Sequence, residues 1–298
     1  MMLDLLSISG LVVSVTLLFL LFASWFDLRT GEIPDEVTLG LSVVMLLVSG
    51  VYSILSYNFS FVLSAFTVGL LYFILGYGLH YLGEWGGGDV KLIAGVGCCL
   101  GFLNVLDYLN EGMMPYYVDY LINIALVSSP YVLVYTLVLG LMKPSVFSRF
   151  RKTLSSKIVL FIVLFSFIPS VSAYLLDLGS LILLYLMIPL LVVLSVYLKT
   201  VEKEALQKTV GLDELQVEDV VAKDLVVDGE KIASSRDISG LSGEDIERIR
   251  GLCDEGKIPS ELRIKWGVRF APIFLFAFLL SVTVGNALEV FVIYFAGL

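Results

Sequence analysis

The chain has 298 residues, of which 58% are hydrophobic and only 16% are charged. Soluble globular domains are usually about 45–50% apolar and about 25% charged, so this composition excludes an ordinary soluble protein. The net charge is −9, but 16 of the 28 acidic residues lie between Lys199 and Lys265, so the negative charge belongs mainly to one polar segment, and no nucleic acid partner is expected.

Apolar runs of about 20 residues, the length that a helix needs to cross the hydrocarbon core, recur along the chain. They predict an all-α polytopic membrane protein, because the sequence shows no alternation of the outer-membrane barrel type. The first run lacks a basic region before it and a small-residue cleavage pattern after it, so we expect a retained helix. The predicted spans are residues 8–26, 37–56, 61–82, 89–107, 118–142, 158–176, 178–198 and 268–295. A turn near Asp177 is expected to join the sixth and seventh of these spans.

The long polar segment before the last span has the pattern of a small folded module. Residues 225–233 read as two short strands joined by the tight turn Asp228-Gly229. Ser242 opens a helix with a spacing like that of a capping box, and Gly256 is expected to end it. We therefore expect a transmembrane core with the catalytic aspartates over residues 1–198, a cytoplasmic α+β module over 199–267 and a C-terminal transmembrane helix over 268–298.

The strongest basic cluster in any short loop lies at residues 143–152. By the positive-inside rule this loop is cytoplasmic, and counting spans from it assigns a side to every other loop. The loop after the first span and the loop before the fourth span are then both cytoplasmic. Asp27 and Asp89 are therefore predicted to lie at the same cytoplasmic face of the cell membrane.

Asp27 and Asp89 lie at the ends of predicted spans, where a carboxylate is costly and is therefore a candidate for function. Asp27 closes the first span. Asp89 opens the fourth span directly after Gly86, Gly87 and Gly88, which allow a peptide to approach closely. Two aspartates that share one proton act as a base toward water and an acid toward a carbonyl, which hydrolyses an amide without a metal or a cofactor. On these residues alone, acids that only cap or flank the spans are an equal alternative.

Other kinds of catalytic site have little support in the sequence. The cysteines Cys98, Cys99 and Cys253 have no metal-ligand spacing, so we expect them to pack and predict no metal site. The single histidine, His80, has no nucleophile beside it and is expected to pack near the interface. The paired aspartates therefore remain the main candidate for chemistry.

The residues around both aspartates carry a specific resemblance. Phe26-Asp27-Leu28-Arg29 is followed by Glu32-Ile33-Pro34-Asp35 and later by Gly86-Gly87-Gly88-Asp89-Val90-Lys91-Leu92. These stretches resemble the type IV prepilin peptidase family of GxGD membrane aspartic proteases, and more narrowly its archaeal preflagellin and prepilin peptidase branch. Residues 247–259 and 270–273 also look like the tail of the archaeal members. That branch is associated with a six-span plan, so six to eight transmembrane helices are expected here.

The resemblance implies that Asp27 and Asp89 are the catalytic pair and that Gly86, Gly87 and Gly88 support the second of them. It implies an endopeptidase that removes the short basic class III signal peptide from preflagellin (archaellin) or type IV pilin-like precursors. Its expected partners are such precursors, each with a basic leader and a hydrophobic helix, and the lipid bilayer. Cleavage would take place at the cytoplasmic membrane face.

The acidic loop suggests how a basic leader could be attracted. Glu32, Asp35 and Glu36, together with Lys91, are candidate contacts with the leader, although a solvated loop and a lysine that reaches the membrane interface are the alternatives. Bacterial members of the family also methylate the new N-terminus and carry a cysteine-rich zinc domain. This chain has neither paired CxxC motifs nor a glycine-rich loop after a predicted strand, so we expect no methyltransferase activity.

Three other functions compete with this interpretation. A presenilin-like or signal-peptide-peptidase-like intramembrane protease also uses two aspartates, but the Pro-Ala-Leu element of those families does not occur here. A cation- or proton-coupled transporter is disfavoured because symmetric repeats with broken apolar segments are not visible. A noncatalytic membrane assembly factor that acts through the polar module is the third alternative.

Overall fold

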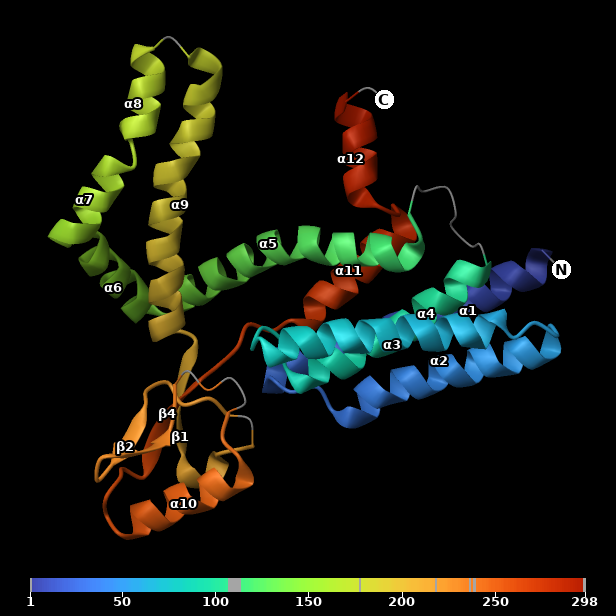
Figure 1. Cartoon of the computed structure of the whole chain (residues 1–298), viewed down its shortest axis with the longest axis horizontal. Coiled ribbons are helices and arrows are strands. Elements are labelled where there is room, and N and C mark those ends of the chain that lie inside the picture. The colour runs from blue at the N-terminus through green and yellow to red at the C-terminus, as the bar shows by residue number, and fades with distance from the viewer. Residues whose placement is uncertain are drawn as a thin grey trace. The chain divides into compact units, whose positions relative to one another are not determined.

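The computed structural model describes residues 2–106, 114–176, 178–217, 219–235, 237 and 240–296. The chain divides into two compact units, one of residues 1–131 with 269–298 and one of residues 132–268. Both units are largely helical, which confirms the predicted helical membrane protein with a small strand-containing module (Figure 1). Asp177, where a turn is predicted, lies outside the described residues.

Seven helical segments of the described residues are long and apolar enough to cross a membrane, and a bent helix pair adds an eighth candidate. This number agrees with the expected six to eight spans. The first helix runs further than predicted and continues through Asp27 to Thr30. The candidate spans lie in α1 (Met2–Thr30), α2 (Asp35–Leu55), α3 (Ser60–Tyr81), α4 (Gly87–Leu106), α5 (Tyr116–Met142), α7 (Lys157–Phe165) with α8 (Ile168–Leu175), α9 (Gly179–Glu204), and α11 (Ala271–Thr283) with α12 (Ala287–Ala296).

Helix α4 is the central helix of the first unit and packs against α1, α2 and α3. Its glycines bring it very close to α3, because a Cβ atom at Gly97 would lie 2.9 Å from the Val68 carbonyl oxygen, and one at Gly101 would overlap the backbone of Ser64. The Ser64 hydroxyl donates a hydrogen bond of 2.8 Å to the Gly101 carbonyl oxygen. Small residues at the interface and a polar bond across it are common ways of joining helices in a membrane.

The predicted span over residues 268–295 is two helices rather than one, because α11 and α12 meet at a bend of 54°. Gly285 takes a φ of +80° at this break. The Asn123 side chain from α5 satisfies freed backbone groups: its amide donates to the Gly285 carbonyl oxygen at 2.7 Å, and its Oδ1 accepts from the Ala287 N–H at 3.2 Å. The side-chain amide of Asn286 also donates to Asp119 Oδ1 on α5 at 2.8 Å. A non-helical stretch is tolerated at membrane depth when protein groups bind it in this way.

The second unit contains the end of α5 and a helical hairpin in which α8 packs against α9 (Figure 1). The basic stretch 143–152, predicted as a loop, is mostly a helix, α6 (Pro144–Leu154), which packs against α9. Arg149 forms an ion pair of 2.8 Å with Glu204, and Lys143 donates to the Ala205 carbonyl oxygen at 3.2 Å. The charges of this basic cluster are therefore partly used in packing the unit.

The polar module forms two small antiparallel sheets and one α-helix around an apolar core. Strands β2 (Leu225–Val227) and β3 (Glu230–Ala233) and helix α10 (Gly243–Asp254) confirm the predicted hairpin and helix. Asp228 and Gly229 have φ values of 53° and 83°, as a tight hairpin turn requires. The sequence analysis missed the second sheet, in which β1 (Gln207–Gly211) pairs with β4 (Glu261–Lys265), and the short 3-10 helix η1 (Leu212–Glu214).

Candidate active site

Asp27 lies in the last turn of α1, and its side chain is buried, with 6% of the residue exposed. The backbone N–H of Ala271, at the first position of α11, donates a hydrogen bond of 2.9 Å to Asp27 Oδ2. The backbone N–H of Phe270 also interacts with this carboxyl group. The first N–H groups of a helix have no partner within the helix and carry partial positive charge, so Asp27 caps α11 and is stabilised by its N-terminus.

Arg269 is the cation that accompanies Asp27. It immediately precedes α11, is only 8% exposed and interacts electrostatically with the Asp27 carboxyl group. Its guanidinium group lies directly against Gly31, so that a Cβ atom at this position would overlap it, and Gly31 also has a φ of +87°. Gly31 therefore allows both the positive φ of the turn after α1 and the close approach of the guanidinium group.

Asp89 is the third residue of α4 and is partly buried. The N–H of Gly86 donates a hydrogen bond of 3.1 Å to Asp89 Oδ2, so the carboxyl group helps to cap the start of its own helix. Gly88 packs against Ile33 in the loop after α1, and a Cβ atom at Gly88 would lie 3.4 Å from the Ile33 Cβ. Asp27 and Asp89 interact electrostatically with each other. The structure therefore brings the two predicted aspartates together where α1 ends and α4 begins.

The other predicted site residues lie around this pair on the loop and on α4. Glu32, Asp35 and Glu36 are exposed. Lys91 forms an ion pair of 2.6 Å with Asp35, which joins α4 to the start of α2. Lys91 therefore contacts the acidic loop rather than Asp89.

The sequence analysis missed the contribution of α11 to the site. The ring of Trp85 lies 5.2 Å from that of Phe274 and 6.2 Å from that of Phe270 between centroids. His80 Nδ1 lies 2.9 Å from the Trp85 carbonyl oxygen, which anchors the turn before the glycines. The sequence did contain one indication of a role for Arg269. A basic residue directly before a helix is unfavourable for the helix dipole, so its presence there suggests a nearby acidic partner.

Two further observations concern ligands. Among the residues that the structure describes, no group of three or more His, Cys, Asp or Glu side chains is placed to hold a metal ion.

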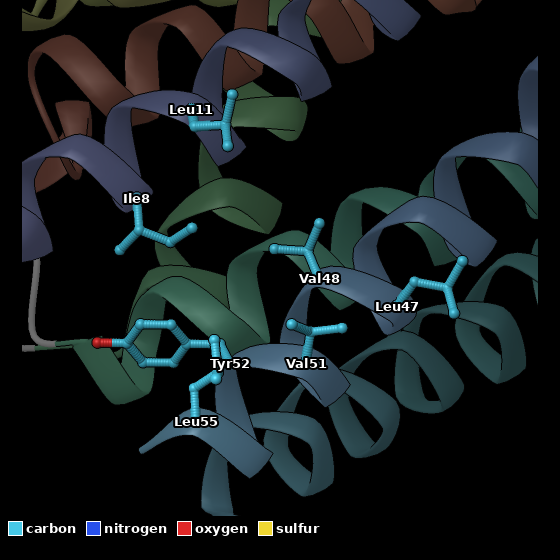
Figure 2. Close-up of a pocket in the computed structure, with 7 residues that line it drawn as sticks. All are labelled: Ile8, Leu11, Leu47, Val48, Val51, Tyr52 and Leu55. Carbon is cyan, nitrogen blue, oxygen red and sulfur yellow. The ribbon is translucent and has the colours of Figure 1, made fainter.

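A cavity of about 310 Å³ opens between the first half of α1 and the second half of α2 (Figure 2). Asp27 and Asp89 are not among its lining residues, and the labelled side chains are apolar apart from one tyrosine hydroxyl. The lining residues are Ile8, Leu11, Leu47, Val48, Val51, Tyr52 and Leu55.

Comparison with known proteins adds independent evidence. The sequence pattern of the type IV leader peptidase family matches residues 14–144, a range that contains both aspartates. A prepilin peptidase, EppA, of Methanothermobacter thermautotrophicus is 25% identical over 93% of this chain and 94% of its own length. Preflagellin peptidases of Methanocaldococcus jannaschii and Methanococcus voltae are 35% and 34% identical over 29% of this chain, and the matches cover 36% and 37% of their own lengths. No solved structure matches the chain. Residues 14–144 of this multi-pass membrane protein match the type IV leader peptidase family, and this match together with the named relatives supports a peptidase.

Proposed function

We propose that the chain is a membrane aspartic endopeptidase that removes the short basic signal peptide from preflagellin or type IV pilin-like precursors at the cytoplasmic membrane face. The observation that carries this proposal is the electrostatic interaction between Asp27 and Asp89, which come from two different helices of the region that matches the family. The names of the similar proteins, prepilin peptidase and preflagellin peptidase, support the class of substrate.

The chemistry needs only the two carboxyl groups and water. One carboxylate takes a proton from water as the water oxygen attacks the scissile carbonyl carbon, while the other carboxyl group gives its proton to the carbonyl oxygen. The tetrahedral intermediate collapses when the leaving nitrogen is protonated and the C–N bond breaks. A new carboxyl terminus and a new amino terminus result, and the pair again holds one proton.

A basic leader is proposed to approach along the loop between α1 and α2. Glu32 on that loop, and Asp35 and Glu36 in the first turn of α2, present exposed carboxylates there, and a field of one sign attracts an oppositely charged peptide. Because Asp35 is already paired with Lys91, a leader lysine or arginine would meet Glu32 and Glu36 first and would compete with Lys91 for Asp35. Replacing Glu32 and Glu36 by glutamine should raise KM and weaken its dependence on salt, with kcat little changed. Unchanged KM at low salt would exclude this contact.

The dyad itself is tested by Asp27→Asn and Asp89→Asn in the full chain, coexpressed with a precursor whose processing is followed by gel mobility. Each asparagine keeps an oxygen that can accept the same backbone hydrogen bond, from Ala271 or Gly86, so the change removes charge and proton transfer but preserves the cap. Asp119→Asn is a matched control, because it also replaces a buried aspartate. We expect both dyad variants to lose cleavage and the control to retain it. Cleavage by either dyad variant would contradict the proposal.

The alternatives give different results in the same experiment. A transporter or an assembly factor would leave the precursor uncut by the wild-type protein, and the family match disfavours both. An intramembrane protease of the presenilin type would cut inside the hydrophobic helix rather than before it, which mass spectrometry of the product distinguishes. The same spectrum tests the expected absence of methyltransferase activity, because a methylated new N-terminus is about 14 Da heavier.

The proposed cytoplasmic position of the site is also testable. A single cysteine placed at Glu36, in a chain without its three native cysteines, should react with a membrane-impermeant thiol reagent in inverted vesicles but not in intact cells. The opposite pattern would place the aspartates at the outer face.

A further inference from the structure

We propose that Arg269 and the N-terminal N–H groups of α11 hold Asp27 as the ionised member of the pair, so that Asp27 is the base toward water and Asp89 carries the proton. This inference rests on the proposed function and deepens it, because it gives each aspartate its own role and adds Arg269 as a positioning residue.

The surroundings of Asp27 favour a negative charge through three separate contacts. Ala271 donates its backbone N–H at 2.9 Å, Phe270 adds a second backbone interaction, and Arg269 contributes a full positive charge. Ala271 is the first residue of α11, so its N–H has no acceptor within the helix and donates to Asp27 instead. Hydrogen bonds and ion pairs to a carboxylate favour its charged form.

The position of Arg269 is determined by packing. The residue is 8% exposed, and its guanidinium group fills the space above Gly31, where no side chain is present. A buried arginine next to a buried aspartate is favourable only when the two compensate one another, because each charge alone loses its hydration. Arg269 therefore links the turn after α1 to the start of α11 and keeps its charge beside Asp27.

The surroundings of Asp89 provide less compensation for a charge. Among the residues that the structure describes, its carboxyl group accepts one hydrogen bond, from the N–H of Gly86 directly before its own helix. The start of α4 contributes a partial positive charge, as the start of α11 does for Asp27, so the helix ends alone do not separate the two acids. The basic group on the same helix, Lys91, is bound to Asp35 at 2.6 Å. The negative charge of Asp27 itself disfavours a second charge on Asp89.

This arrangement determines which aspartate takes a proton and which gives one at each step of the reaction. Water loses a proton to the Asp27 carboxylate, and its oxygen bonds to the scissile carbonyl carbon while Asp89 gives its proton to the carbonyl oxygen. The proton now on Asp27 passes to the leaving nitrogen as the C–N bond breaks, and Asp89 regains a proton from the hydroxyl of the intermediate. No other reactant is required.

The test is the pH dependence of precursor cleavage by the purified full chain, with Arg269→Gln, Arg269→Lys and Arg149→Gln compared with the wild type. Removing the positive charge beside Asp27 should move the acid limb of the kcat/KM profile upward by about one pH unit or more, and should lower the rate below that limb by about tenfold. Arg269→Lys should restore most of the profile. Arg149→Gln, which removes an arginine paired in the second unit, should leave the profile unchanged. An unshifted limb in Arg269→Gln would overturn the inference.

A second readout does not depend on activity. Infrared difference spectra of Asp27→Asn and Asp89→Asn at neutral pH report which aspartate carries the carbonyl stretch of a protonated carboxyl group. We expect Asp89→Asn to remove this band; a band that persists in Asp89→Asn and is lost in Asp27→Asn alone would reverse the roles. Failure of the proposed function is distinct, because the wild type would then leave the precursor uncut or either asparagine variant would still cut it.

Discussion

The close contact between α3 and α4 predicts that Gly101→Ala destabilises the first unit. The added Cβ atom would overlap the Ser64 carbonyl oxygen and lie 2.8 Å from the Ser64 carbonyl carbon and 2.9 Å from the Ala65 Cα. All three atoms belong to the backbone, so no side chain can rotate away to make room. The two helices would have to separate, which would also stretch the hydrogen bond from the Ser64 hydroxyl to Gly101.

The size of the effect follows from the overlap. Carbon atoms prefer separations of about 3.5 Å or more, so α3 and α4 would have to move apart by roughly 0.7 Å. Overpacking of this kind typically costs about 1–3 kcal/mol. Gly78→Ala in α3 is the matched control, because nothing lies within 4 Å of the new Cβ. Both variants gain the same helix propensity, up to about 1 kcal/mol, so their difference in unfolding free energy isolates the packing cost.

The assay is reversible unfolding of the full chain in mixed micelles at increasing SDS fraction, with precursor cleavage measured in parallel. Gly101→Ala should be less stable than Gly78→Ala by about 1–3 kcal/mol. Cleavage by Gly101→Ala should fall as well, because α4 also carries Asp89 at its first turn. Equal stability of the two variants would refute the close approach of α3 and α4.

Three further predictions concern other parts of the chain. Ser242→Ala removes the capping box of α10 and should destabilise that helix by about 1 kcal/mol, measured as faster hydrogen exchange of its amides. The Lys231 ammonium group and hydrogen bonds from a nearby serine lower the pKa of Asp224, so the stabilisation that Asp224 gives is present above its unfolded pKa and is lost as the pH falls through the lower folded pKa. Acidification below about pH 4 should therefore loosen the module less in Asp224→Asn than in the wild type, as followed by proteolysis with pepsin. Asn286→Ala should cost about 1–3 kcal/mol in SDS unfolding, because a buried carboxylate on α5 loses its amide donor.

The helices and the catalytic candidates were predictable because their signals are local. A span of apolar residues needs no partner to be recognised, and the boundaries of α2, α3 and α4 lie close to the predicted ones. The hairpin at Asp228-Gly229 and the cap at Ser242 are likewise encoded within a few residues. The match to the family over residues 14–144 includes the motifs around Asp27 and Asp89, while their catalytic role stays a prediction.

The features that were missed depend on residues far apart in the chain. Ala271 lies 244 positions after Asp27, and nothing near either residue indicates their hydrogen bond. Strand β1 has only a weak alternation and finds its partner β4 about fifty residues later. The break between α11 and α12 had one local signal, Gly285-Asn286 within an apolar run, but apolar composition favoured a continuous helix.

The hydrogen bond by which Asp27 caps α11 also has a consequence for the biosynthesis of the protein. Translation and membrane insertion proceed from the N-terminus, so α1 and α4 enter the bilayer with both aspartates long before the ribosome reaches α11. Until that last segment is inserted, Asp27 lacks the N–H of Ala271 and the charge of Arg269. Under the role proposed for Asp27, cleavage is therefore expected only after α11 has been inserted.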